Sequence, residues 1–366
     1  MQIDLNAIDR EQFMVHDHIV NGEVLCLVQP QAISAKWNQS NKIFRSSVWN
    51  AQGELVSASW PKFVNLHENP EVFPVPTDLK KCKIFQKIDG STLIVSKYKG
   101  QFIFRTRGTL DASTMEKNGY EVADLMVKHP EICRFSSQLE TWSFSLLFEW
   151  VSPLNRIVLL YPEPKLFFLG IVNHNDYSLW NQAELDLIAK AWGVERPKMY
   201  SFDTIEDMVE IVKQWEGLEG VVIYSDNDQM MHKAKSDSYL VKHRLKSELS
   251  SFEKLIDFWI TVGKPESFNQ FQDEVEKLTD YETAQEHIGD ISRIIDGYKE
   301  VKKIIDGMIS FIKTAIAQLP DRKCQALKII ESYGSTGRSA MLFKLLDSKA
   351  LDSGDYKKLL FQVLKK

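Results

Sequence analysis

The hydrophobic period of the sequence changes near residue 245, and this change limits the folds that the chain can adopt. Before it, short β-branched and aromatic runs alternate with turn-forming residues, a pattern typical of strands. The predicted strands include residues 102–104, 144–148, 157–160, 166–169 and 221–224. Helical segments are expected around residues 122–127 and 181–192. After residue 245, apolar residues recur at helix spacing, for example from 291 to 298.

The two periods predict an α+β fold with two domains. We expect a strand-rich domain at residues 1–245 and an all-helical domain at 246–366. The helical domain is either a stabilising bundle or a part that binds the substrate. From Arg322 onward, Lys and Arg outnumber Asp and Glu about two to one, which suits phosphate contacts but suits a solvated helix face equally well.

Composition narrows the setting in which the protein acts. The net charge of −5 means that nucleic acid would have to bind a local basic surface. Four widely spaced cysteines predict neither a disulfide framework nor a zinc site, which favours a reducing cytoplasm. No apolar run approaches the roughly 20 residues of a membrane span, and no signal peptide is visible. We therefore expect a cytoplasmic protein that does not enter a membrane.

The segment 87–91, Lys-Ile-Asp-Gly-Ser, is a polar turn between apolar runs. Gly90 would allow a ligand to approach the backbone closely. Lys87 would be a nucleophile only when uncharged, and its ordinary pKa is about 10.4. Activation would need nearby cations, a metal or desolvation. Taken alone, such a segment is more often a hairpin turn with a surface lysine.

Two acids and a lysine pair follow in the same domain. Glu149 lies within an apolar predicted strand, where a carboxylate needs a cation, a metal or a ligand hydroxyl as partner, although a structural salt bridge would also suffice. Glu219 opens another predicted strand. Lys233 and Lys235 would project from one face of a strand. Paired cations stabilise phosphoryl transfer, but lysines also protect exposed edge strands.

Four further cations lie before and after Lys87. Arg45 and Lys62 precede it, and Arg105 and Arg107 alternate on the strand predicted after it. Without other information, a surface position is expected for each.

The order of these elements resembles that of the covalent nucleotidyltransferases. Segments 87–91, 148–149, 219–222 and 233–236 resemble their motifs I, III, IV and V. Segments 62–70, 153–159 and 235–239 further resemble the RNA ligase 1 family, typified by the T-even bacteriophage tRNA-repair ligase. The resemblance extends over residues 40 to 245. It implies a mixed or antiparallel-sheet nucleotidyltransferase domain, an ATP-grasp-like ligase fold.

The resemblance also implies roles for the central residues. Lys87 would attack the α-phosphorus of ATP, expel pyrophosphate and hold AMP. Glu149 would bind the ribose hydroxyls, and Glu219 would hold Mg²⁺ or Mn²⁺ through water. Lys233 and Lys235 would grip the α-phosphate.

Residues outside this centre receive roles by the same resemblance. Arg107 and Tyr239 match positions that bind RNA or are needed for ligation. Segment 27–30 lacks the family's aromatic nucleotide contact, so the sequence predicts no adenine-binding residue there. The ATP-binding residues that the resemblance adds to the central set are Arg45, Lys62, Asp89 and Gly90.

The function implied is ATP-dependent joining of 5′-phosphate and 3′-hydroxyl RNA ends through lysyl-AMP and adenylylated RNA. A nicked tRNA is the substrate that the family suggests, in a bacterial cell or a phage-infected host, without an obligate protein partner. Alternatives are an adenylyltransferase with another acceptor and a non-sealing RNA-binding relative. A DNA ligase or capping enzyme is disfavoured, because those families usually follow motif V with a strand-rich module.

Overall fold

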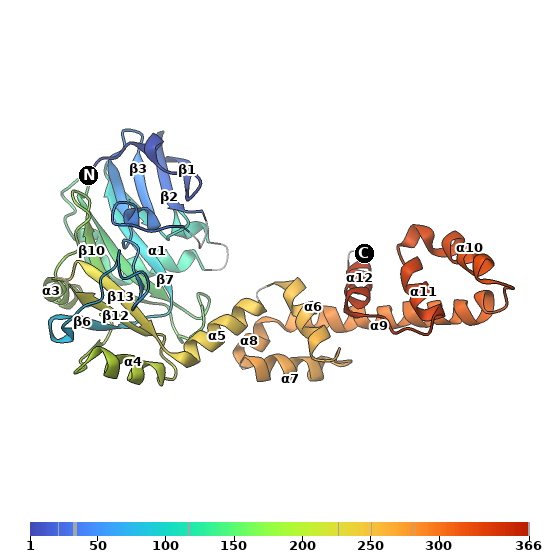
Figure 1. Cartoon of the computed structure of the whole chain (residues 1–366). Coiled ribbons are helices and arrows are strands. Elements are labelled where there is room, and N and C mark those ends of the chain that lie inside the picture. The colour runs from blue at the N-terminus through green and yellow to red at the C-terminus, as the bar shows by residue number, and fades with distance from the viewer. Residues whose placement is uncertain are drawn as a thin grey trace. The chain divides into compact units, whose positions relative to one another are not determined.

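The chain forms two compact units in a computed structural model, which describes residues 1–20, 22–31, 35–115, 118–225, 227–249, 251–279 and 281–364. The units are Met1–Val241 and Lys242–Lys366. The predicted boundary at residue 245 falls inside helix α5 (Asp237–Glu248), which begins in the first unit and continues into the second (Figure 1).

The first sheet of the first unit is an antiparallel meander in the order β1-β2-β3-β4. Its strands are β1 (Phe13–Val20), β2 (Glu23–Pro30), β3 (Ser47–Asn50) and β4 (Leu55–Ala58). Every residue of β3 and β4 is buried. Just before β3, the short 3-10 helix η2 (Lys42–Arg45) carries the first cation that the sequence singled out.

The second sheet is also antiparallel, in the order β10-β9-β7-β8. Its strands are β7 (Ser91–Tyr98), β8 (Gln101–Arg105), β9 (Phe144–Val151) and β10 (Lys165–Asn173). Strand β9 is buried along both faces, as its apolar run requires. The strand predicted at 157–160 is wrong, because this segment is irregular and the N–H groups of Val158 and Leu159 bond to a side chain, Asp89.

The third sheet, in the order β11-β6-β12-β13-β5, is mixed because β13 and β5 run parallel. Its strands are β5 (Val64–Asn65), β6 (Lys83–Lys87), β11 (Met199–Tyr200), β12 (Gly220–Ser225) and β13 (Met230–Lys235). The antiparallel pairing of β6, β12 and β13 sets Lys87, Gly220 and Lys235 in one row. The α+β fold with antiparallel and mixed sheets is therefore confirmed.

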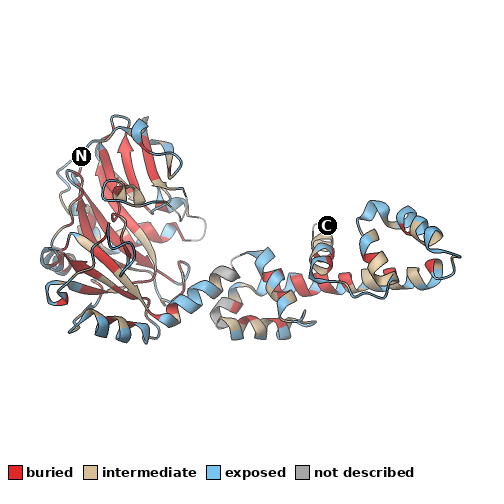
Figure 2. Cartoon of the chain, viewed as in Figure 1, coloured by how far each residue is buried: buried red, intermediate tan, exposed pale blue. Residues whose placement is uncertain are grey.

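Helices complete the first unit. They are α1 (Tyr120–Lys128), α2 (Pro130–Arg134), α3 (Gln182–Trp192) and α4 (Ile205–Lys213), and α1 and α3 confirm the two predicted segments. Helix α4 begins where the Thr204 side chain accepts a hydrogen bond from the Asp207 N–H, and it packs Met208 and Val212 onto the third sheet. Figure 2 shows the strands mostly buried and much of α4 exposed.

The second unit is helical throughout its described residues, which confirms the predicted all-helical region. Its helices after α5 are α6 (Phe252–Thr261), α7 (Phe268–Leu278), α8 (Tyr281–Glu286), α9 (Ile288–Phe311), α10 (Arg322–Tyr333), α11 (Ser339–Leu346) and α12 (Ser353–Leu364). They share one hydrophobic core that includes Trp259, Phe271 and Ile294. None of the described helices has the length and apolar character that crossing a bilayer requires.

Candidate active site

The site lies where three strands of the third sheet end together. Lys87 is the last residue of β6, Lys235 is the last residue of β13, and Glu219 immediately precedes β12. Gly220, between the two lysines in the row, has φ 146°, and a Cβ there would lie 2.0 Å from the carbonyl oxygen of Ala234. Only glycine fits this position, because any side chain would push the strands apart.

Glu219 binds both lysines of the row. Its Oε2 accepts a hydrogen bond from Lys87 Nζ, and its Oε1 accepts one from Lys235 Nζ, each at 2.9 Å. The Glu219 side chain is 2% exposed, whereas the lysine side chains are 21% and 20% exposed. The two ammonium groups thus compensate a buried carboxylate, while both lysine side chains remain partly exposed.

Lys233 lies beside this row and is surrounded by other cations. Its pKa is lowered to about 7, mainly by burial and in addition by the charges of Arg45, Lys235 and Lys87. A lysine in this environment is only partly protonated at neutral pH, so an added anion would restore its charge.

Phe63 contacts two of these cations. The Arg45 guanidinium lies 4.6 Å from the centre of its ring and Lys233 Nζ lies 5.5 Å away. Lys62 lies over Trp37 at 5.4 Å. Cation–π contacts of this kind hold positive groups in place without neutralising them.

Arg45 has an unmet hydrogen-bonding need. Among the residues that the structure describes, its buried Nη1 has no hydrogen-bond partner. The pKa of Arg45 is lowered to about 9, mainly by burial and in addition by the charge of the exposed Arg107, so the two guanidinium groups lie within electrostatic reach. A buried N–H group without an acceptor points to a ligand that supplies one.

Glu149 lies on β9 opposite Thr92 of β7, whose hydroxyl donates to Glu149 Oε2 at 3.4 Å. Burial raises the pKa of Glu149 to about 7, with Lys87 opposing the rise and Glu219 adding to it. The carboxyl group is therefore partly protonated near neutral pH, and its ribose-binding role stays a prediction.

Both carboxylate oxygens of Asp89 accept hydrogen bonds from other residues of the chain. Its Oδ2 accepts hydrogen bonds from the N–H groups of Val158 (2.8 Å) and Leu159 (2.7 Å), and its Oδ1 accepts one from the Tyr239 hydroxyl (2.7 Å). Its ATP-binding role stays a prediction. The geometry gives Asp89 a further role, which is to hold the motif I turn against a distant loop and against α5.

Gly90 and Tyr239 lie close to this turn. A Cβ on Gly90 would lie 2.5 Å from the Trp150 carbonyl oxygen, so glycine permits the contact with β9. The buried ring of Tyr239 lies 4.7 Å from Lys235 Nζ, and burial raises the pKa of its hydroxyl. The residue expected to matter for ligation therefore contacts motif V and motif I at once.

The prediction for Arg105 is wrong. The side chain is 0% exposed rather than on the surface. Strand β8 ends at Arg105, so Arg107 lies beyond the strand rather than alternating with it. Arg105 shares a strand face with Ile103, which packs in a buried cluster, and this explains its burial.

Sequence reasoning missed some residues of the site. Ser91 donates to Asn155 Oδ1 at 2.9 Å, and the Asp89 N–H donates to the Tyr161 hydroxyl at 3.3 Å. Asn155 falls within the family-like segment 153–159, so a signal was present. Tyr161 carried no signal in the sequence.

A divalent metal could bind here only with help from a ligand. No group of three His, Cys, Asp or Glu side chains among the described residues could form a cage for an ion. Mg²⁺ commonly takes one or two carboxylates together with waters and phosphate oxygens. Glu219, acting through water, fits that donor set.

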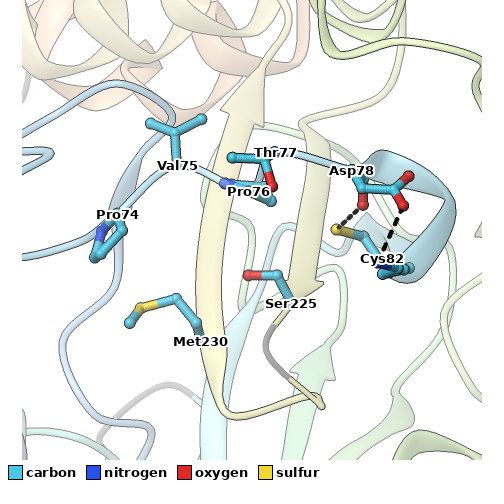
Figure 3. Close-up of a pocket in the computed structure, with 9 residues that line it drawn as sticks. Pro74, Val75, Pro76, Thr77, Asp78, Cys82, Ser225 and Met230 are labelled. Carbon is cyan, nitrogen blue, oxygen red and sulfur yellow. Dashed lines mark hydrogen bonds and ion pairs between the residues drawn. The ribbon is translucent and has the colours of Figure 1, made fainter.

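A separate hollow of about 290 Å³ lies at the other end of the β12–β13 hairpin (Figure 3). Ser225 and Met230, the residues that flank the hairpin turn, line it together with Asp78 and Cys82. None of the predicted site residues belongs to its lining, so it is distinct from the site.

A lysine held by a buried glutamate at the end of three strands, with further cations beside it, defines a covalent nucleotidyltransferase type of site. A family model described as RNA ligase matches residues 43–250, which include every predicted site residue. The chain belongs to this RNA ligase family.

The individual relatives match only about half of this chain, at less than 30% identity. A protein of Autographa californica nuclear polyhedrosis virus named "Putative bifunctional polynucleotide kinase/RNA ligase" is 29% identical over 51% of this chain and 27% of its own length. A "Putative RNA ligase" of Thermovibrio ammonificans is 25% identical over 46% of this chain and 43% of its own length. The chain thus spans less than half of each. The solved archaeal ATP-dependent RNA ligase form 1 is 14% identical, with a TM-score of 0.49 over 77% of this chain and 76% of that one.

Proposed function

We propose that this protein is an ATP-dependent RNA ligase that joins 5′-phosphate and 3′-hydroxyl ends through a lysyl-AMP on Lys87. The observation that carries the proposal is the row in which Lys87 and Lys235 share the buried Glu219. Membership of the RNA ligase family supports RNA as the substrate.

In the first step, Lys87 Nζ forms a bond to the α-phosphorus of ATP, and the bond from that phosphorus to the pyrophosphate oxygen breaks. Lys87 must first lose a proton to present its electron pair. Glu219 holds the Nζ in place, while the partial exposure of Lys87 leaves it open to the nucleotide. Holding a nucleophile in line with its target removes much of the entropic part of the barrier.

The neighbouring cations address the phosphates. Lys235 and Lys233 lie beside Lys87 and stabilise the negative charge on the α-phosphate during transfer. Arg45 and Lys62 address the outer phosphates, and the unpartnered Nη1 of Arg45 gains an acceptor when they bind. Glu149 accepts hydrogen bonds from the ribose hydroxyls.

Glu219 is the residue that would hold Mg²⁺ or Mn²⁺, through water. Such an ion, when bound, neutralises charge on the phosphate oxygens. Both oxygens of Glu219 accept from lysines, so Glu219 would have to exchange at least one of these bonds for a bond to water in order to hold such an ion.

In the later steps, AMP passes from Lys87 to the RNA 5′-phosphate, and the 3′-hydroxyl then displaces AMP. Each step is an in-line displacement at phosphorus, so the same cations can serve all three. Exposed Arg107 binds the RNA end, and Tyr239 keeps Lys235 and Asp89 in register for ligation. We assign RNA choice, with a nicked tRNA as the candidate, to the helical second unit.

The test uses ATP labelled at the α-phosphate. The expected result is an acid-labile covalent adduct in the wild-type protein and none in Lys87→Ala. Absence of the adduct, or an equal adduct in the variant, would falsify the proposal. An adduct that never transfers to 5′-phosphorylated RNA would instead favour an adenylyltransferase with another acceptor.

A further inference from the structure

Arg105, the last residue of β8, carries a positive charge inside the first unit. Its side chain is 0% exposed, and no described carboxylate forms an ion pair with it. Burial lowers its pKa to about 9, so the group is still cationic at neutral pH. Because an uncompensated buried charge is costly, its N–H groups must all find acceptors.

Four of its hydrogen bonds go to Ser46, which precedes β3, and to Ser57 of β4, and a fifth goes from Nη1 to the Thr106 carbonyl oxygen (3.1 Å). Nη1 donates to Ser46 Oγ (2.8 Å) and Nη2 to the Ser46 carbonyl oxygen (3.1 Å). Nε donates to Ser57 Oγ (2.7 Å) and Nη2 to the Ser57 carbonyl oxygen (3.2 Å). The planar guanidinium thus joins the residue after η2 to strand β4 in fixed geometry.

Ser46 connects the fixed guanidinium of Arg105 to the backbone of two cations of the site. It directly follows Arg45, and its hydroxyl donates to the Arg107 carbonyl oxygen at 2.8 Å. Arg107 and Arg45 are close enough that the charge of one lowers the pKa of the other. Two repelling guanidinium groups stay together only if their backbones are held, and Ser46 holds both.

Ser57, the other serine that accepts from Arg105, is hydrogen-bonded to the second sheet. Ser57 Oγ, which accepts from Arg105, also accepts from Ser96 Oγ on β7 at 2.8 Å. Strand β7 also carries Thr92, the partner of Glu149. The bonds of Arg105 therefore connect the cation pair to the strand that faces the ribose-binding acid.

We propose that Arg105 is a positioning residue, which acts through Ser46 to hold Arg45 and Arg107 side by side for phosphate binding. The inference rests on the proposed function, in which these two arginines address the outer phosphates of ATP and the RNA end. Arg105 and Ser46 themselves touch no substrate.

The test is Ser46→Ala in the full chain, which removes the bridging hydroxyl without changing any charge. We expect the KM for ATP in lysyl-AMP formation to rise about tenfold, and the maximal rate to change less than about twofold, because ground-state phosphate binding is lost. In an Arg45→Ala background, Ser46→Ala should add no further rise, because its effect passes through Arg45.

Two more variants separate positioning from simple stability. Ser225→Ala removes a buried hydroxyl at the far end of β12, outside the hydrogen bonds of Arg105, and should leave the KM unchanged. Arg105→Lys keeps the charge but lacks the planar fork, and should raise the KM as Ser46→Ala does.

The inference is overturned if Ser46→Ala binds ATP as the wild type does, or if Ser225→Ala raises the KM equally. It is also overturned if Ser46→Ala raises the KM for ATP just as much in the Arg45→Ala background as in the wild type. These failures occur in a protein whose wild type forms lysyl-AMP, whereas failure of the proposed function removes the adduct from the wild type itself.

Discussion

Glu219 is the residue on which the two lysines of the site converge. Its carboxylate is buried, and each of its oxygens accepts from one ammonium group. Neither lysine could be placed by its own strand alone, because a long side chain at a strand end has many rotamers of similar energy. The shared acid therefore fixes where the nucleophile points.

Glu219→Gln is expected to slow lysyl-AMP formation by about 100-fold or more, in the range seen when a group that preorganises charge is removed. The amide keeps the shape but no longer balances two ammonium groups. Glu266→Gln is the matched control, because Glu266 pairs with Lys302 on the surface. Equal adenylylation rates in both variants would contradict the role of Glu219.

Lys233 should make stability depend on pH in a definite direction. Its pKa falls from 10.5 to about 7 on folding, mainly through burial, so between these values the unfolded chain binds more protons and the stability contribution of Lys233 rises with pH. Lys233→Met should be more stable than wild type at pH 7, and the difference should shrink toward pH 9. Melting temperatures at both pH values measure this, and a constant difference argues against it.

The sequence predicted the central residues of the site better than the residues that hold them in place. Lys87, Glu149 and Glu219 were predicted from the order of the motifs in the chain and from the family resemblance that this order carries. The hydrogen bonds that Asp89 accepts from Val158 and Leu159 could not be predicted. A side-chain bond across some seventy residues leaves no local pattern in the sequence. Arg105 was misplaced for the same reason, since its acceptors are hydroxyl and carbonyl groups on other strands.

At the scale of elements, the site depends on how closely β12 and β13 approach. Gly220 faces the backbone of Ala234 and pairs with Lys235, which lets the Lys235 side chain reach the neighbouring Glu219. The alternation of the sequence predicted both strands, but it could not predict the register, which depends on pairing across the sheet.

Gly220→Ala is expected to disrupt this sheet, because the added Cβ would lie 2.0 Å from a carbonyl oxygen. We predict a loss of lysyl-AMP formation and a large drop in melting temperature, corresponding to about 3 kcal/mol or more. Gly217→Ala is the control, since Gly217 also has positive φ but an added Cβ meets no atom within 4 Å. Similar losses in the two variants would show that backbone strain alone is responsible.

The segment 157–160 shows the limit of apolar runs as evidence for strands. Its residues suggested β structure, yet their N–H groups bond to Asp89 instead of to a neighbouring strand. Helices α1 and α3 were predicted correctly because their signal, the spacing of apolar residues, is local.

At the scale of the whole molecule, the two units have separate hydrophobic cores. The core of the second unit contains residues from Leu249 to Leu360 and none from the first unit. The other clusters lie within the first unit. Separate cores are typical of parts that fold on their own.

A chain ending at residue 251, which retains α5, is therefore expected to form lysyl-AMP at a rate within about threefold of the full chain. It should lose preference for nicked tRNA over unstructured RNA, because the helical unit is absent. Rates of adenylylation and of joining on the two RNAs measure this. Loss of adenylylation on truncation, or an unchanged RNA preference, would contradict the division of roles.

The most direct measurement of the central claim is a single-turnover chase. Adenylylated protein, freed of ATP, is mixed with RNA that carries a 5′-phosphate and a 3′-hydroxyl. The prediction is that label leaves Lys87, passes through an adenylylated RNA and appears as AMP while a joined RNA forms. Label that stays on the protein, or that leaves it without a joined RNA, would contradict the assignment of Lys87 as the carrier of AMP for RNA sealing.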